Sequence, residues 1–170
     1  MRLLFCLLAV IPLGGTTLRL LTMDDIVNQS TSIVRGRIGS CAGELHGNVI
    51  YTRCQIDVTE TWKGASASDV YFPGGTARGR TQTFAGSPVL TSGQEYVLFL
   101  WAGKSGINQV IGLTQGVFQL NQSQGMTTAI RAASTEPMLD ARGRPVQDAT
   151  LRYSAADLKR LVMQTLGRAK

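Results

Sequence analysis

The sequence predicts a mainly β protein: a small, mostly antiparallel β-barrel of five to six strands, with a short N-terminal helix and a C-terminal amphipathic helix. Several stretches alternate apolar and polar residues at the period of a β-strand. Nineteen glycines against 6% aromatic residues indicate many turns. One alternating stretch, residues 51–64, is too long for a flat sheet in a domain of this size, so we expect it to coil around a barrel. A β-sandwich is the alternative.

Residues 1–17 have the layout of a secretory signal peptide. Arg2 precedes an apolar run over residues 3–13, and small residues follow up to Thr17, near which we expect cleavage. A run of this length is too short to cross about 30 Å of hydrocarbon as a helix. We therefore expect export to the periplasm or the cell exterior, with no stable membrane span after the signal is removed.

The predicted barrel domain covers residues 22–125 and begins with a helix. Thr22 can cap this helix, and Asp24 and Asp25 would lie in its first turn, where acidic side chains are favourable. The pattern predicts a helix over residues 23–29, followed by a strand over residues 31–40.

Gly47 and Asn48 suit a two-residue hairpin turn of type II′. Counting outward from this turn places Cys41 opposite Cys54 and Arg35 opposite Glu60. The same register would place Ile38 opposite Asp57, on the wrong face of the strand. We therefore expect a bulge, or a longer loop, between residues 40 and 51.

Cys41 and Cys54 are the two cysteines that remain after the signal peptide is removed. An isolated pair in an oxidising compartment is expected to form a disulfide. The short loop between them predicts a stabilisation of about 3 kcal/mol. The alternative is a metal site that adds His46 and Glu44, but these spacings match no zinc pattern. We expect no cofactor.

The later barrel strands are expected over residues 69–72, 95–101, 107–113 and 116–120. Residues 95–101 are almost entirely apolar, which predicts a central strand buried on both faces. The glycine-rich stretch before it is expected to be a loop that is extended in part, over residues 80–84.

Residues 126–170 are expected to form a polar linker followed by a helix over about residues 154–166. Ser154 and Asp157 suit a capping box at the start of this helix. Its apolar stripe is expected to pack on the barrel, with contact to a partner as the alternative. The stripe contains Leu158, Leu161, Val162 and Leu166.

No group of residues predicts catalysis. His46 is the only histidine, and no nearby acid can be assigned to orient it. Asp57 and Glu60 face opposite sides of one strand, so they do not form a pair for general acid/base catalysis. The loop around residues 73–80 lacks the Lys-Ser/Thr ending of a phosphate-binding loop. Arg78 and Arg80 in this loop are candidates for contact with an anion.

The net charge of +6 is spread along the chain rather than clustered. A nucleic-acid-binding face would need clustered basic residues, so we do not expect nucleic acid as a partner. The charge instead indicates a solvated basic surface, which favours contact with anionic cell-surface polymers. We expect a monomer whose partner is another protein or a cell-envelope polymer.

The order of these motifs resembles the netrin-like oligonucleotide/oligosaccharide-binding (OB) barrel found in tissue inhibitors of metalloproteinases. The resemblance rests on "IVRG" at residues 33–36, "WKG" at 62–64 and "GQEY" at 93–96, and covers about residues 24–120. The chain also looks like a group of short, uncharacterised exported bacterial proteins that share "IVRGRI", "TWKG" and "GQEYVLFL".

The resemblance implies a barrel but not a mechanism. Metalloproteinase inhibitors act through a cysteine at the mature N-terminus, and no cysteine lies between Cys6 and Cys41 here. The leading hypothesis is therefore a non-catalytic exported binding or interaction module. The alternatives are an inhibitor or accessory domain of a secreted metalloprotease, and a hydrolase whose site is not recognisable from sequence.

Overall fold

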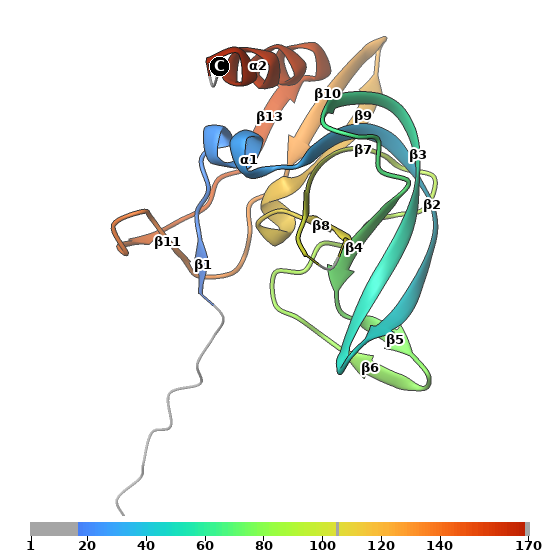
Figure 1. Cartoon of the computed structure of the whole chain (residues 1–170). Helices are drawn as coiled ribbons and strands as arrows, with labels where there is room; N and C mark the ends of the chain where they lie inside the picture. The colour runs from blue at the N-terminus through green and yellow to red at the C-terminus, as the bar shows by residue number, and fades with distance from the viewer. Residues whose placement is uncertain (1–16, 105, 169–170) are drawn as a thin grey trace, which may run out of the picture.

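The computed structural model describes residues 17–104 and 106–168 (Figure 1). Almost all of the predicted signal peptide, residues 1–16, lies outside the described residues. The fold is mainly β. Its helices are α1 (Met23–Gln29), the 3-10 helix η1 (Leu113–Gly116) and α2 (Ala155–Arg168). Its strands are β1 (Leu18–Arg19), β2 (Ser32–His46), β3 (Val49–Lys63), β4 (Asp69–Pro73), β5 (Gly75–Ala77), β6 (Arg80–Gln82), β7 (Glu95–Ala102), β8 (Asn108–Val110), β9 (Val117–Ser123), β10 (Met126–Arg131), β11 (Met138–Leu139), β12 (Pro145–Val146) and β13 (Leu151–Ser154).

Eight of these strands form one large sheet in the order β13-β10-β9-β7-β2-β3-β4-β8. Neighbouring strands are antiparallel except β4 and β8, which pair in parallel through Tyr71 and Gln109. Strand β7 also pairs with β8, so the pairings β7–β2–β3–β4–β8 return to β7. The β5–β6 hairpin and a small sheet of β1, β11 and β12 stand apart from the large sheet.

The β2–β3 hairpin satisfies both the pairing predicted from its turn and the apolar face that seemed to conflict with that pairing. Cys41 pairs with Cys54 and Arg35 with Glu60, while Ile38 pairs with Ile56 rather than with Asp57. Register shifts between these pairs reconcile them. The main one lies between Ile38 and Cys41, so the expected irregularity starts slightly before residue 40. Gly47 has φ +62° whereas Asn48 does not have positive φ, as a type II′ turn requires.

Strand β7 separates two hydrophobic cores, as its unbroken apolar sequence predicted. On one face, Val34, Leu98 and Leu100 pack with the apolar residues of β3 and β4, and we call this cluster the inner core. On the other face, Val97 and Phe99 pack with β9, β10 and the two helices, and we call this cluster the outer core. The side chains from Tyr96 to Leu100 are all apolar and buried, which suits a strand that is covered on both faces.

Residues 126–131 and 151–154, which lie in the stretch expected to include a polar linker, form strands of the large sheet instead. Strand β10 pairs with β9 from Met126 to Ile130, and β13 pairs with β10 through Ala129 and Tyr153. These strands extend the large sheet beyond β7. Arg131 at the end of β10 is buried because Asp148 neutralises it, with Nη2 and Oδ1 2.6 Å apart.

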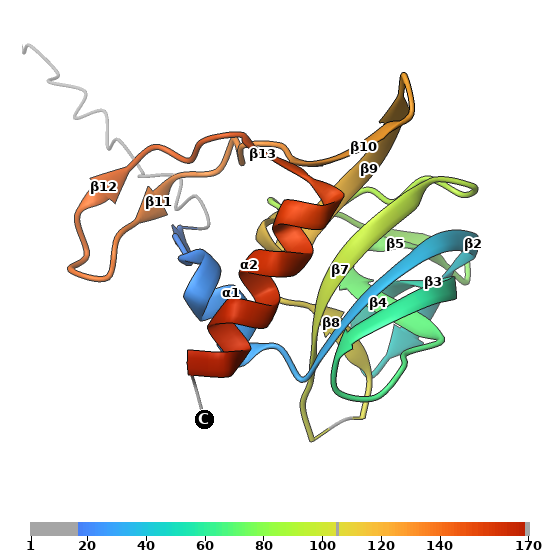
Figure 2. The ribbon, with the colours of Figure 1, turned by 90° about the horizontal axis from the view of Figure 1, so that it is seen from above.

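The two helices lie side by side on the outer core (Figure 2). Thr22 caps α1, as predicted, and Asp25 completes a capping box with it. At α2, Asp157 N–H donates to Ser154 Oγ over 3.0 Å. This helix continues to Arg168, slightly beyond the predicted end, and buries Leu158 and Val162. No helix in the described part of the chain is long and apolar enough to cross a membrane.

Candidate binding surface

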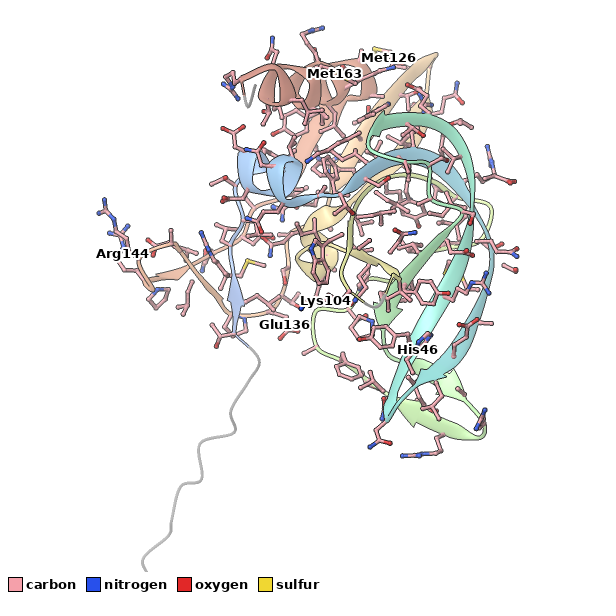
Figure 3. The ribbon with its side chains drawn as sticks, viewed as in Figure 1. His46, Lys104, Met126, Glu136, Arg144 and Met163 are labelled. Atoms are coloured by element: carbon pink, nitrogen blue, oxygen red, sulfur yellow. A yellow bond between two sulfur atoms is a disulfide. The ribbon has the colours of Figure 1, made fainter. Side chains whose placement is uncertain are left out.

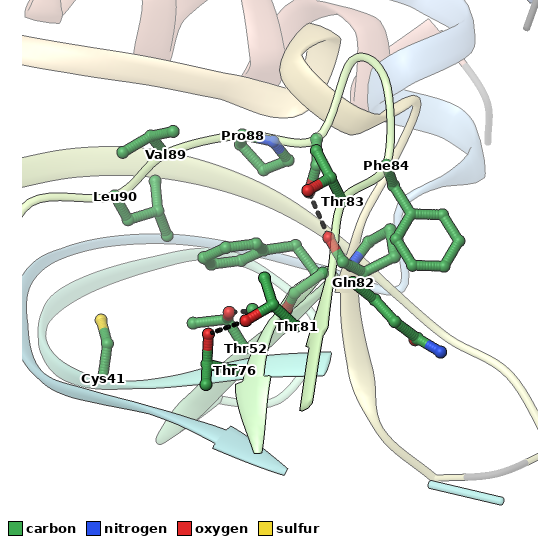
Figure 4. A pocket seen from close by; sticks show the side chains of 15 residues that line it. Cys41, Thr52, Thr76, Thr81, Gln82, Thr83, Phe84, Pro88, Val89 and Leu90 are labelled. Atoms are coloured by element: carbon green, nitrogen blue, oxygen red, sulfur yellow. Dashed lines mark hydrogen bonds between the residues drawn. The ribbon is translucent and has the colours of Figure 1, made fainter. Parts of the chain in front are cut away.

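A groove of about 410 Å³ lies between the inner face of the β2–β3 hairpin, the β5–β6 hairpin and residues 83–90 (Figure 4). We call it the mouth groove. Its walls come from four separate stretches of the chain. They are formed by Cys41, Thr52, Phe72, Pro73, Gly74, Gly75, Thr76, Thr81, Gln82, Thr83, Phe84, Ser87, Pro88, Val89 and Leu90.

The β5–β6 hairpin is fixed in place by contacts with the tip of the β2–β3 hairpin. The side chain of Gln82 accepts a hydrogen bond from Ile50 N–H at 2.7 Å and donates to the Asn48 carbonyl at 2.9 Å. Gly43 faces the backbone of Thr76 so closely that a Cβ atom there would overlap the Thr76 carbonyl oxygen. The absence of a side chain at Gly43 therefore lets the two hairpins meet.

The lining of the mouth groove is uncharged and combines apolar side chains with hydroxyl and amide groups. Its polar side chains largely bond within the protein: Thr52 Oγ1 donates to the Gly74 carbonyl at 2.7 Å, and the hydroxyls of Thr76 and Thr81 are 2.9 Å apart. Two large apolar side chains at its edge are exposed, Phe84 at 39% and Val89 at 87%. An exposed apolar surface beside a hollow is typical of a binding site.

Cys41 and Cys54 form the predicted disulfide. Cys54 is fully buried in the inner core, whereas Cys41 is exposed and lines the mouth groove. Because the two sulfur atoms are joined, neither is available as a thiolate ligand for the alternative metal site. Within the described residues, no group of three or more His, Cys, Asp or Glu side chains is arranged to hold a metal ion.

Arg78 and Arg80 lie at the tip of the β5–β6 hairpin. Arg78 and Gly79 both have positive φ, which is the geometry of a type I′ turn, and Ala77 pairs with Arg80 across it. Both arginines are exposed, and neither forms a salt bridge within the described residues. Their charges are therefore free to meet an anion from outside.

His46 belongs to an aromatic group on the outer face of β2, β3 and β4 (Figure 3). Its ring contacts Tyr51 and Tyr71 edge to face, at 5.7 and 5.6 Å between centroids. Arg53 lies beside them and bridges Glu44 and Asp69. The alternation of β3 could have indicated that Tyr51 and Arg53 share a face, but the neighbours from β2 and β4 required the sheet.

Glu60 is the centre of a charged cluster at the other end of β3, in a hollow between β3, β10 and α2. Its carboxylate accepts hydrogen bonds from Lys159 Nζ at 2.6 Å, Trp62 Nε1 at 3.0 Å and Arg35 Nη1 at 2.9 Å. The bonds from Lys159 and Trp62 are the main cause that lowers the pKa of Glu60 to about 2. The hairpin register predicted only the partner Arg35.

The Glu60 cluster and His46 are separate sites. Along β3, Glu60 lies eleven residues from Val49, the partner of His46, which corresponds to about 36 Å of extended strand. The structure therefore does not bring the only histidine to the acidic side chain with the strongest shift in pKa.

No protein-family model matches this chain, and no curated protein matches it. The resemblance to netrin-like barrels therefore remains an expectation from the sequence. What the chain does has to be inferred from the mouth groove and the surfaces around it.

Proposed function

We propose that this protein is an exported, non-catalytic binding module built on a netrin-like OB barrel, and that it binds its ligand in the mouth groove. The closed circuit of pairings β7–β2–β3–β4–β8–β7 supports the barrel. Five mainly antiparallel strands, with the longest two forming a curved hairpin, are the architecture expected of an OB fold.

The observation that carries the proposal is the uncharged mouth groove itself. Its volume of about 410 Å³ is within the range of small-molecule sites, and its lining combines apolar walls with a few hydroxyl groups. Phe84 and Val89 remain exposed at its edge although neither is needed to fill a core. A contiguous exposed apolar surface beside a hollow is typical of a ligand-binding groove.

Export is supported by the disulfide between Cys41 and Cys54, because such bonds persist in oxidising compartments. A non-catalytic role is supported by the way the charged groups are used. Glu60 is engaged by Lys159, Trp62 and Arg35, and these contacts join α2 to the sheet. None of these groups borders the mouth groove.

The test is a titration of residues 18–170, with the disulfide intact, with the uncharged dye Nile red, whose fluorescence rises in apolar surroundings. We expect a saturable rise for the natural sequence and a clear loss for Val89→Asp, which places a charge at the groove. The control is Met126→Asp, because Met126 is also strongly exposed, at 69%, but lies away from the groove. Equal binding by the natural protein and Val89→Asp, or no binding by either, would refute the proposal.

A further inference from the structure

The apolar surface of the mouth groove continues into a second hollow. This hollow of about 160 Å³ is bordered by Tyr96, Val117 and Ile130, and it shares Pro88 and Val89 with the mouth groove. No charged side chain lines either hollow. The apolar surface is therefore elongated, from the β5–β6 hairpin past Val89 to β9 and β10, which suits a linear apolar chain better than a compact ligand.

Positive charge, in contrast to this apolar surface, is found at the tip of the β5–β6 hairpin, which forms one wall of the mouth groove. Thr76, Thr81 and Gln82 border the mouth groove, and Arg78 and Arg80 follow at the exposed tip of the same hairpin. Two other exposed arginines are neutralised: Arg144 is 2.7 Å from Asp140, and Arg160 is 2.7 Å from Asp157. Arg142 and Arg152 are exposed and have no salt bridge within the described residues, but they border neither hollow. Arg78 and Arg80 have no such acidic partner within the described residues.

We propose that the mouth groove binds an anionic amphiphile with a single apolar chain. This inference rests on the proposed function and specifies the ligand. The chain lies along the groove and over Val89, and the anionic head group meets the guanidinium groups of Arg78 and Arg80. A carboxylate and a phosphate share the chemistry that arginine recognises, since both accept paired hydrogen bonds from a guanidinium group.

The experiment is a calorimetric titration of residues 18–170, below the micelle-forming concentration of each compound. The compounds are laurate, dodecyl phosphate and the uncharged monolaurin, which have chains of equal length. We expect the two anions to bind about tenfold or more tightly than monolaurin, as expected for one charge-assisted hydrogen bond. This preference should weaken as salt is added, because the arginines are exposed. The compound that binds more tightly distinguishes a carboxylate from a phosphate head group.

The double variant Arg78→Ala/Arg80→Ala should lose the preference for anions while keeping its affinity for monolaurin. The matched control is Arg142→Ala/Arg144→Ala, which removes two exposed positive charges from the turn between β11 and β12; neither residue borders either hollow, so the preference should remain. A double variant that binds laurate as tightly as the natural protein would overturn the inference, as would equal affinity for laurate and monolaurin. If monolaurin and Nile red still bind in those cases, the proposed function stands; if no compound binds, the proposed function fails as well.

Discussion

At the scale of single residues, Gly43 decides whether the mouth groove can form. Its position on the inner face of β2 is where the β5–β6 hairpin crosses, with the backbone of Thr76 directly against it. Nothing in the sequence around Gly43 marks this contact, because it joins segments more than thirty residues apart. Gly43 lies where the sequence predicted only a bulge or a longer loop, whereas in the structure it allows the close approach of two hairpins.

Gly43→Ala should displace the β5–β6 hairpin and weaken Nile red binding, with a loss of stability of about 1–3 kcal/mol from overpacking. Equilibrium unfolding in urea and dye titration measure the two effects. Gly39→Ala is the control, because a Cβ there would meet Gln55 Cβ at an ordinary 3.4 Å. If Gly43→Ala behaves as Gly39→Ala does, the contact with Thr76 does not position the hairpin.

Glu60 makes stability depend on pH. Its folded pKa of about 2 is below the ordinary value of 4.5, so its contribution is complete above pH 4.5 and is lost as the pH falls toward 2. We expect Glu60→Gln to cost about 1–2 kcal/mol at pH 7, after allowance for partial solvent screening. The difference from the natural protein should shrink steadily as the pH falls from 4.5 toward 2.

Urea unfolding at several pH values checks this expectation, with Asp57→Asn as the control because Asp57 is exposed on the same strand. A Glu60→Gln deficit that stays constant from pH 7 to pH 2 would show that the loss does not come from the charge of the carboxylate.

At the scale of elements, the sequence predicted those strands whose pattern is strong and local. The register of β2 and β3 could be predicted from Gly47, Cys41 and Cys54 together. Strands β10 and β13 could not be predicted, because their burial depends on contacts with other segments of the chain. Arg131 reads as an exposed polar residue until Asp148 is known to neutralise it.

The mouth groove was beyond prediction for a similar reason. Arg78 and Arg80 could be recognised as candidates for anion contact from their loop, but the groove beside them takes its walls from β2, β3, β4, the β5–β6 hairpin and residues 83–90. Only the fold brings these segments together.

Helix α2 should be an integral part of the fold rather than an appendage. Leu158 is fully buried against the outer core, so Leu158→Ala should cost about 2–5 kcal/mol. Met163 is 41% exposed on the same helix, and Met163→Ala should cost less than about 1 kcal/mol. Urea unfolding, monitored by circular dichroism, measures the stability of the two variants. Equal and small effects would indicate that α2 is only loosely attached.

At the scale of the whole molecule, the disulfide joins the two longest strands at the mouth of the groove. We expect residues 18–170 to be a monomer without free thiols, and Cys41→Ala/Cys54→Ala to lose about 2–4 kcal/mol of stability. Thiol titration without reductant, size-exclusion chromatography and urea unfolding test the three parts. Two reactive thiols in the purified protein would contradict the disulfide.

The contact between α1 and α2 has a consequence for how the chain acquires its fold. Residues 26 and 27 share the outer core with residues 158 and 162, so this core cannot close until almost the whole chain is available. Contacts over such sequence separations slow folding. A nascent chain would therefore lack a complete outer core for most of its synthesis. An incompletely folded polypeptide is the form that can be threaded through a translocation channel.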